Sequence, residues 1–468
     1  MSSPARSWRR RLAEPLTPRD VAQAGLCIGC GACGAGQGAL AWDRFGQLKP
    51  ADDWAGNAVP AFDQFCPFSP DARNEDAIAA ERFPAPARRD ERIGSFEAAY
   101  VGHVAEGEYR AGGSSGGMVS WVAAELLRRG LIDGVAHVVP VDPTRGDRFF
   151  RYRISRSVDE IGEGARSRYY PVELSAVFDE IRAVPGRYAI VGVPCFIKAT
   201  NLLRDVDSVI AERVAFTLGL FCGHMKSARL VESFAWQLNA PMDQVRAVEY
   251  RQKNPDRPAN WYTAHLTLAD GSARWQDWMH LADGDWGAGF FQNNACNYCD
   301  DVMGETADIA FGDAWVEPYS SDGRGTNVVI VRSPEVQRIV AEAIGERRLT
   351  LDPVDADFIA NTQAAGLRQR RDGLAYRLRF APPRLPLRKR VAPGGEALPL
   401  RRKLIYRTRR RISSGSHRLF ATARALHWPR LYLSWARLAL GLYGALAYLR
   451  GPLGRLVGRL SDDDRNSW

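Results

Sequence analysis

The chain has 468 residues, of which 46% are hydrophobic and 25% are charged, and this composition excludes collagen-like, disordered and polytopic membrane proteins. The net charge of +9 lies at the end of the chain, because residues 384–468 hold 19 Lys and Arg against 4 Asp and Glu, whereas residues 1–383 hold 44 against 50. The positive charge therefore belongs to a tail, and we expect no nucleic-acid partner because no known binding module accompanies it.

Changes in composition divide the chain into three segments, which agrees with a length of about 150 residues per domain. Residues 1–90 are rich in loops and end in a linker of Pro and charged residues at 83–90. Residues 91–383 alternate amphipathic helices with apolar strands. Residues 384–468 are rich first in Pro and then in Arg, and we expect them to be partly helical and amphipathic.

The stretch at 7–11 resembles a twin-arginine export signal, but Glu14, Pro15 and Pro18 interrupt the apolar segment that such a signal needs. We therefore expect a cytoplasmic protein. In that reducing compartment, the eight cysteines are expected to be metal ligands or buried thiols rather than disulfides.

The first four cysteines have the spacing of an iron–sulfur site. Cys27, Cys30 and Cys33 form a Cys-x2-Cys-x2-Cys loop whose glycines let the backbone curl around a compact object. By elimination, the fourth ligand of a [4Fe–4S] cluster is Cys66, which precedes Pro67. A structural zinc site is the alternative, but zinc sites usually pair two Cys-x-x-Cys arms. The spacing favours the cluster.

The central segment shows the alternation that is typical of α/β proteins. Strands are predicted at 134–141, 188–193 and 214–221, and helical faces at 119–126, 174–181 and 230–238. Residues 261–278 predict an antiparallel hairpin that turns at Asp270-Gly271. We therefore expect an α/β fold with a mixed, largely parallel sheet core, preceded by the N-terminal iron–sulfur segment.

The remaining four cysteines are scattered, and each alone could be a buried thiol. Cys195 and Cys222 each follow a predicted strand, so in a parallel sheet both would emerge at the edge where α/β proteins bind ligands. The Cys296-x-x-Cys299 loop could close over that edge and complete a second four-thiolate site. Buried thiols and a redox pair remain open as alternatives.

Five motifs follow one another between residues 25 and 335. They are Cys27-Ile28-Gly29-Cys30-Gly31-Ala32-Cys33, Gly112-Gly113-Ser114-Ser115-Gly116-Gly117-Met118, Gly192-Val193-Pro194-Cys195, Leu220-Phe221-Cys222-Gly223, and Cys296-Asn297-Tyr298-Cys299 with the following 307–315. Together they resemble the coenzyme F420 hydrogenase/dehydrogenase beta subunit family, which also contains 7-hydroxymethyl chlorophyll a reductase and ferredoxin-dependent vinyl reductases. The resemblance does not extend to the tail.

The resemblance implies two [4Fe–4S] clusters and a bound FAD. Electrons would pass from a ferredoxin-like one-electron carrier or a deazaflavin coenzyme through the Cys27/Cys30/Cys33/Cys66 cluster and then the Cys195/Cys222/Cys296/Cys299 cluster to the flavin and a small organic substrate. An electron-transfer subunit with a partner redox subunit and no substrate of its own is the alternative, and a zinc-stabilised scaffold is a third. The family name does not establish coenzyme F420 as the substrate.

The flavin assignment also has a physical basis in the Gly/Ser-rich loop. Ser114 and Ser115 could cap a helix that begins near Gly117, and Ser114, Ser115, Gly116 and Gly117 are the residues expected to bind the cofactor. The free N–H groups and the dipole of that helix would then bind the FAD pyrophosphate. Most such turns merely cap a helix, so the loop is weak evidence by itself.

Five further side chains near these motifs are open to two interpretations. Lys198 and His224 could tune a cluster or supply protons, or they could simply be solvated or hydrogen-bonded. Asp308, Asp313 and Trp315 could flank the flavin, although ordinary strand-end hydrogen bonds and packing are the simpler interpretation.

The tail combines a basic run at 401–411 with an apolar, aromatic stretch at 431–449. Its uninterrupted apolar part, 438–449, is shorter than the 20 or so residues that a membrane-spanning helix needs. Two interpretations remain open. One is an interfacial helix on an anionic membrane surface, which would make the protein peripheral to the inner face of the membrane. The other is an amphipathic helix packed on its own body or a partner.

Overall fold

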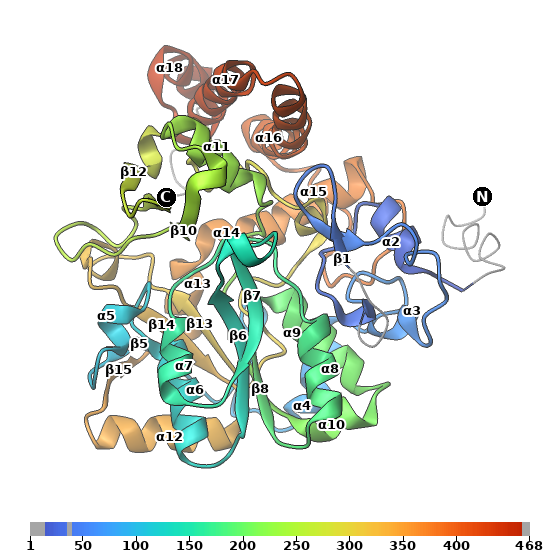
Figure 1. Cartoon of the computed structure of the whole chain (residues 1–468), viewed down its shortest axis with the longest axis vertical. Helices are drawn as coiled ribbons and strands as arrows, with labels where there is room; N and C mark the ends of the chain where they lie inside the picture. Colours follow the sequence, from blue (N-terminus) through green and yellow to red (C-terminus); the bar gives the residue numbers. More distant parts are fainter. Residues whose placement is uncertain (1–14, 35–39, 461–468) are drawn as a thin grey trace.

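The structure is a computed structural model that describes residues 15–34 and 40–460. The stretch at 7–11 that resembles an export signal lies outside the described residues. The N-terminal segment, the central sheet and the C-terminal helices are seen together in Figure 1.

An eight-stranded mixed sheet forms the centre of the molecule (Figure 1). Its strands, in spatial order, are β15 (Leu349–Pro353), β5 (Ala98–Val104), β14 (Asn327–Val331), β13 (Ile309–Asp313), β9 (Val214–Leu220), β8 (Tyr188–Gly192), β6 (Gly134–Pro140) and β7 (Phe150–Ser155). The four strands β13, β9, β8 and β6 pair in parallel, and the outer strands pair antiparallel. The predicted α/β class with a mixed sheet is confirmed, and its parallel part is confined to these four strands.

Helices cover both faces of the sheet, because successive residues of a buried strand point to opposite sides. In β8, Ala189 and Val191 belong to the hydrophobic cluster of one face, and Ile190 belongs to that of the other. The first face is covered by α6 (Met118–Arg128), α7 (Val158–Glu163) and α12 (Pro334–Gly345), and the second by α8 (Ser175–Ala183), α9 (Pro194–Arg204) and α10 (Ser208–Arg213).

The predicted strands at 134–141, 188–193 and 214–221 correspond to β6, β8 and β9. The predicted helical faces at 119–126 and 174–181 correspond to α6 and α8, and the third corresponds to α11 (Arg229–Gln237). The predicted hairpin is formed by β11 (Thr263–Leu268) and β12 (Ala273–Asp277), to which β10 (Val245–Glu249) adds a third antiparallel strand.

The N-terminal segment consists of short elements that pack on helices α8 and α9. Leu26, Ile28 and Phe65 share one hydrophobic cluster with Phe178 and Phe196 of these helices. The segment contains α2 (Pro18–Gln23), β1 (Leu40–Trp42), β2 (Leu48–Pro50), α3 (Phe62–Phe65), α4 (Glu75–Arg82) and β3 (Arg88–Asp90), which pairs with β4 (Gly94–Phe96).

The C-terminal part is helical and packs on the body of the protein. Its helices are α13 (Ala356–Thr362), α14 (Ala364–Arg370), α15 (Asp372–Phe380), α16 (Leu400–Ala425), α17 (Pro429–Tyr448) and α18 (Gly451–Leu460). Elsewhere in the chain, a short helix α5 (Tyr109–Gly112) precedes α6. Ile412, Phe420 and Tyr432 of α16 and α17 belong to the same hydrophobic cluster as the sheet face covered by α8 and α9. The interpretation that the tail packs on its own body therefore holds for these two helices. None of the described helices is long and apolar enough to cross a membrane.

Candidate functional site

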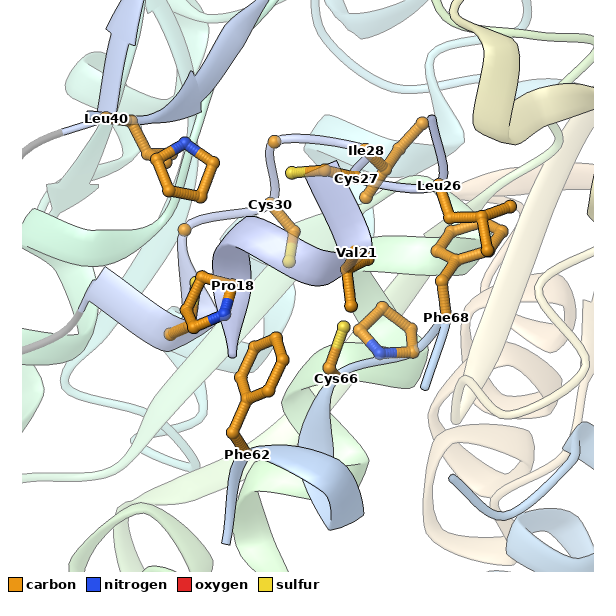
Figure 2. A pocket seen from close by; sticks show the side chains of 15 residues that line it. Pro18, Val21, Leu26, Cys27, Ile28, Cys30, Leu40, Phe62, Cys66 and Phe68 are labelled. Carbon is orange, nitrogen blue, oxygen red and sulfur yellow. The ribbon is translucent and has the colours of Figure 1, made fainter. Parts of the chain in front are cut away.

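The structure brings the four N-terminal cysteines together. Cys27, Cys30, Cys33 and Cys66 all line one small cavity of about 20 Å³. Figure 2 shows the sulfur atoms of Cys27, Cys30 and Cys66 directed into the same space. Cys27 to Cys33 lie on the loop after α2, and Cys66 follows directly after helix α3. We call these residues the first quartet.

Two glycines give the first quartet its tight loop. Gly29 and Gly31 have φ angles of 76° and 85°, which L residues with a side chain rarely adopt. A Cβ atom on Gly29 would lie 2.5 Å from the carbonyl oxygen of Leu48, and one on Gly31 would lie 2.8 Å from the backbone nitrogen of Ser175. The loop therefore needs glycine at both positions for conformation and for space.

The thiols of the first quartet are buried and repel one another when ionised. Burial raises the pKa of Cys30 to about 12. It also raises the pKa of Cys33 well above its ordinary value, and the neighbouring Cys30, Cys27 and Cys66 raise it further. Cys30, Cys33 and Cys66, whose pKa values are raised in this way, are protonated at neutral pH unless a positive centre binds them.

The structure also brings the other four cysteines together. Cys195 is the second residue of helix α9, which follows β8, and Cys222 lies two residues after the parallel neighbour β9. Cys296 lies in the 3₁₀ turn Asn294–Tyr298, and Cys299 is the residue that ends it. We call these residues the second quartet.

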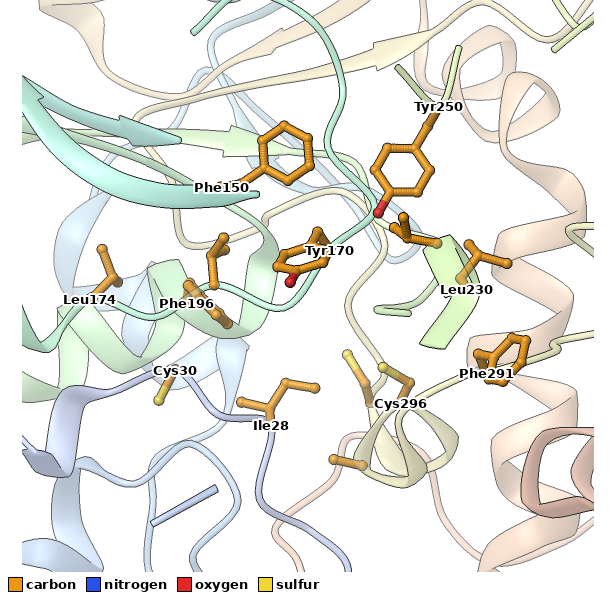
Figure 3. Packing of buried hydrophobic residues seen from close by; sticks show 14 of the residues in the cluster. Ile28, Cys30, Phe150, Tyr170, Leu174, Phe196, Leu230, Tyr250, Phe291 and Cys296 are labelled. Carbon is orange, nitrogen blue, oxygen red and sulfur yellow. The ribbon is translucent and has the colours of Figure 1, made fainter. Parts of the chain in front are cut away.

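Electrostatics shows that the second quartet is compact and lies near the first. Burial raises the pKa of Cys195 well above its ordinary value, and repulsion from Cys299, Cys222 and Cys296 adds to the effect. Cys30 of the first quartet contributes to the same shift. Cys30 and Cys296 also share one hydrophobic cluster, in which both are labelled in Figure 3.

A buried arginine holds the loops of the second quartet. Arg370, the last residue of α14, is only 3% exposed. Its guanidinium donates hydrogen bonds to the carbonyl oxygens of Cys296 (2.7 Å) and Gly223 (2.6 Å), and longer ones to those of Cys299 and Cys222 (3.4 Å each). Among the described residues, no carboxylate lies within ion-pair distance of it. The four thiols are therefore the source of negative charge that faces this buried cation.

Neither quartet is arranged around a single point. Among the residues that the structure describes, no group of three or more His, Cys, Asp or Glu side chains could hold one metal ion.

A much larger cavity, of about 1070 Å³, adjoins the second quartet. Cys222 lines it directly, as do Ser114, Ser115 and Gly117 of the Gly/Ser-rich loop. Aromatic side chains form much of the remaining wall, and these are Tyr152, Tyr169, Tyr170, Tyr262, Trp286 and Trp315. The cavity thus connects the loop before α6 with a cysteine of the second quartet.

The predicted capping of α6 by Ser114 and Ser115 is wrong. The helix begins at Met118. The residue before it is Gly117, which has a φ of 86° and no side chain that could cap the helix. Instead, the side-chain oxygen of Asn327 on β14 accepts a hydrogen bond from the Met118 nitrogen at 3.2 Å. The two serine hydroxyls are engaged elsewhere, since Ser114 accepts from the Ser167 nitrogen (2.8 Å) and Ser115 donates to the Thr326 carbonyl (2.9 Å).

The loop before α6 also approaches its neighbours closely at Gly116. A Cβ atom there would lie 2.7 Å from the carbonyl oxygen of Gly102. Gly116 does not line the cavity, whereas Ser114, Ser115 and Gly117 do. Three of the four residues predicted to bind FAD therefore face the cavity, and Gly116 allows the loop to lie against β5.

Of the polar side chains near the cysteines, His224 lines the cavity and Lys198 does not. The Lys198 ammonium forms a buried ion pair with Glu75 at 3.1 Å. His224 stacks on Trp286, with ring centroids 4.4 Å apart, and burial holds its pKa well below the ordinary value. Lys198 therefore has a structural contact that accounts for it, and His224 is a neutral imidazole in the wall of the cavity.

The three residues at the end of the family motif have different positions. Asp308 accepts from the backbone nitrogen and the hydroxyl of Thr217 and pairs with Arg82, so it fastens strands together. Asp313 and Trp315 line the cavity. The guanidinium of Arg251 binds both, at 2.8 Å from the Asp313 carboxylate and 5.1 Å from the Trp315 ring.

Sequence reasoning missed Arg370, Asn327 and Arg409, which lies on α16 and lines the cavity. Arg370 and Arg409 stand among other arginines at 368–371 and 407–411, and nothing in the sequence distinguishes the buried member of each run. The polar Asn327 at the start of an otherwise apolar strand, 327–331, was a signal that could have been used.

Two family models match the chain. Both describe the coenzyme F420 hydrogenase/dehydrogenase beta subunit; the model of its N terminus matches residues 99–179, and the model of its C terminus matches residues 186–357. Among solved structures, a chain of the F420-reducing [NiFe] hydrogenase complex from Methanosarcina barkeri is similar, with 17% sequence identity and a TM-score of 0.47, over 60% of this chain and 92% of that chain. No significant match was found among curated proteins.

Proposed function

We propose a function on the premise that this chain belongs to the coenzyme F420 hydrogenase/dehydrogenase beta subunit family, whose two models match more than half of its residues. It is therefore a redox protein related to a hydrogenase or dehydrogenase subunit. We infer that it is an iron–sulfur flavoprotein oxidoreductase in which each quartet holds a [4Fe–4S] cluster and the large cavity holds FAD. Its donor would be a ferredoxin-like carrier or a deazaflavin, and its acceptor a small organic molecule.

The single observation that carries this proposal is the position of Cys222. It belongs to the second quartet, and it also lines the large cavity. A metal centre held by the quartet would thus lie against whatever the cavity binds. That proximity is what electron transfer between a cluster and an organic cofactor requires, whereas a structural zinc site has no need of it.

The chemistry of the two quartets supports iron clusters. The buried Arg370 guanidinium has only carbonyl oxygens and thiols as partners, and a buried charge is stable only when it is compensated. Four thiolates around an iron cluster provide the compensating negative charge.

The cavity supports a flavin and a substrate together. Ligand sites usually measure about 300–1,000 Å³, and this one measures about 1070 Å³. Its loop end presents the N-terminus of the 11-residue helix α6, whose unpaired N–H groups suit a pyrophosphate. Its aromatic walls suit a planar ring system. A chain that only relays electrons between clusters would not need such a space, which favours an enzyme over the electron-transfer subunit.

When bound, the clusters and FAD would supply the exchange between one-electron carriers and a two-electron substrate. Overall, two reduced one-electron carriers and two protons would reduce one substrate molecule by two electrons. The chain itself positions the groups: Arg370 fixes the cysteine loops, and Asn327 anchors the start of α6. The aromatic residues of the wall would exclude water from the space beside Cys222 when the cavity is filled.

Metal and flavin analysis of the protein purified without oxygen tests this function. We expect about eight irons, about eight acid-labile sulfides and one flavin per chain, with the visible absorption of both cofactor types. Zinc in place of iron, without flavin, would contradict the proposal.

A further inference from the structure

The cavity is completed by the tail, which lies outside the region matched by the family models. Helix α16 is fixed to the segment before Cys296 by three hydrogen bonds. The Ser416 hydroxyl accepts from the Phe291 nitrogen (2.8 Å), and the Ser413 hydroxyl and the His417 ring bond to the Gln292 carbonyl (3.0 Å each). One helical turn further back, α16 places Arg409 in the cavity wall.

Arg409 carries a positive charge that no carboxylate neutralises. Its Nη2 donates to Nδ1 of His224 (3.3 Å) and to the side-chain oxygen of Gln292 (3.1 Å). Among the described residues, no Asp or Glu lies within ion-pair distance of it. Burial and the neighbouring Arg370 lower the pKa of the guanidinium more than Tyr443, Asp285 and Tyr448 raise it. Such a cation in a cavity wall is a binding site for an anion.

The whole cavity has an excess of positive charge. Its charged lining residues are Arg166, Arg168, Lys226, Asp313, Arg368 and Arg409. Asp313 is paired with Arg251, and Arg166 with Glu249. The remaining four cations have no carboxylate partner among the residues that the structure describes. An anionic ligand is therefore expected.

The cations of the cavity wall have different neighbours. Arg166 and Arg168 flank Ser167, whose nitrogen donates to Ser114 of the loop before α6. Arg409 instead contacts His224, two residues from Cys222. Lys226 lies 5.0 Å from the ring of Trp286, on which His224 stacks. The loop end would be taken by the FAD pyrophosphate, which leaves the cations at the Cys222 end for another molecule.

We infer that Arg409 binds a carboxylate or phosphate group of the organic substrate, so that the substrate is an anion held between the tail helix and the wall near Cys222. This inference rests on the proposed function. Its guanidinium can form two parallel hydrogen bonds to either kind of group. Trp286 and Tyr169, whose rings lie 4.6 Å apart, provide an apolar surface for the rest of the molecule.

Isothermal titration calorimetry on the full chain, purified without oxygen with its cofactors, tests the inference. Inorganic phosphate and succinate are the two anionic probes, and uncharged succinamide is the control ligand. We expect saturable binding of at least one anion. Binding of phosphate would indicate a phosphate group on the substrate, and binding of succinate would indicate a carboxylate. Succinamide should not bind. Binding of neither anion would overturn the inference.

Three variants assign the binding to Arg409. Arg409→Gln should weaken anion binding at least tenfold, because a charged hydrogen-bond partner is lost. Arg409→Lys should lose less affinity for the anion, because the positive charge remains. Arg411→Gln is the matched control, since Arg411 lies on the exposed side of the same helix. Unchanged binding by Arg409→Gln, with an unfolding temperature like that of the wild type, would overturn the inference.

The lysine variant keeps the test decisive if Arg409→Gln is unstable. Arg409→Lys is then compared with the wild type, and an unchanged affinity for both anions would contradict the inference, because Lys cannot form the two parallel hydrogen bonds of a guanidinium. Iron and flavin contents are measured on the same samples. If the iron and flavin contents are normal but anion binding does not depend on Arg409, only this inference is contradicted. If iron and flavin are absent, the proposed function is contradicted. Calorimetry needs no cofactor signal, so it reports on Arg409 in either case.

Discussion

Arg370 is the residue on which the second quartet depends most. It joins the end of α14 to both cysteine loops by binding the carbonyl oxygens of Cys222, Cys296 and Cys299. A carbonyl accepts a hydrogen bond from any donor, but only a cation also compensates thiolates. Arg370 therefore acts both as a structural link and as a charge next to the proposed cluster.

We predict that Arg370→Gln lowers the reduction potential of the second cluster by about 60–130 mV. The lost interaction of a cation with an added electron corresponds to about 1.5–3 kcal/mol, and about 59 mV corresponds to a tenfold change for one electron. A redox titration followed by electron paramagnetic resonance measures the potential. The control is Arg379→Gln, because Arg379 is exposed on α15. An unchanged potential in an Arg370→Gln protein with full iron content would contradict this role.

Single residues were predictable from the sequence where spacing restricted them. The Cys-x2-Cys-x2-Cys loop, the two cysteines after strands and the Cys296-x-x-Cys299 loop supplied seven of the eight thiols that the structure gathers, and Cys66 was added by elimination. Arg370 was not predictable, because its neighbours Arg368 and Arg371 have the same chemistry and only the packing of α14 selects one of them. The prediction that Ser114 and Ser115 cap α6 was wrong because Asn327, which is far away in sequence, accepts the hydrogen bond from the first residue of the helix.

At the scale of elements, the parallel strands and their helices were predictable because apolar runs alternate with amphipathic helices. The antiparallel strands β5, β14 and β15 were not, since a buried run such as Val328–Val331 looks the same in either direction. The tail was ambiguous for a similar reason. Its apolar stripe fits a membrane surface or a protein surface equally well, and only the complementary groups on the 290–293 segment decide for α16.

The docking of α16 should depend on pH through His417. This imidazole is buried against the Gln292 carbonyl, and burial lowers its pKa to about 4 from an ordinary value near 6.5. The unfolded chain therefore binds more protons between these values, so stability falls as the pH decreases through 6.5. We expect a loss of about 1 kcal/mol from this residue between pH 7.5 and 5.5.

Thermal unfolding at a series of pH values measures this effect. His137, whose pKa burial also lowers to about 4, adds a loss of the same sign. His224, whose pKa burial holds well below its ordinary value, adds a further loss, so His417→Asn should remove about 1 kcal/mol of the pH dependence in this range and leave the rest. His427→Asn is the control, because His427 is exposed and has a positive φ that Asn tolerates. Equal pH dependence in the wild type and His417→Asn would contradict the assignment.

At the scale of the whole molecule, the tail is joined to the second quartet by buried charges as well as by helices. Asp300 directly follows Cys299 and is buried. Lys389 pairs with it at 3.2 Å, and the Arg390 nitrogen donates to it at 3.1 Å. Arg390 also binds Glu305 through both terminal nitrogens. The quartet, the sheet and the tail therefore form one cooperative unit.

We predict that Arg390→Gln lowers the free energy of unfolding by about 3 kcal/mol or more, because the buried Glu305 loses both hydrogen bonds from the guanidinium and keeps only Arg371, at 3.6 Å, among the described cations. Arg388→Gln should change it by less than about 1 kcal/mol, since Arg388 is 55% exposed and lies 3.8 Å from Asp71. Denaturant unfolding of the two variants measures the difference. A similar loss of unfolding free energy in both variants would show that the buried ion pairs of Arg390 do not hold the tail.

The central claim is that the eight cysteines form two separate cluster sites, one of which adjoins the flavin cavity. The most direct test is the iron content of Cys66→Ser and Cys222→Ser beside the wild type, each purified without oxygen. We predict about eight irons in the wild type and about four in each variant, because each substitution removes a ligand from only one quartet. Loss of all iron in either variant, or no loss in either, would contradict two independent sites.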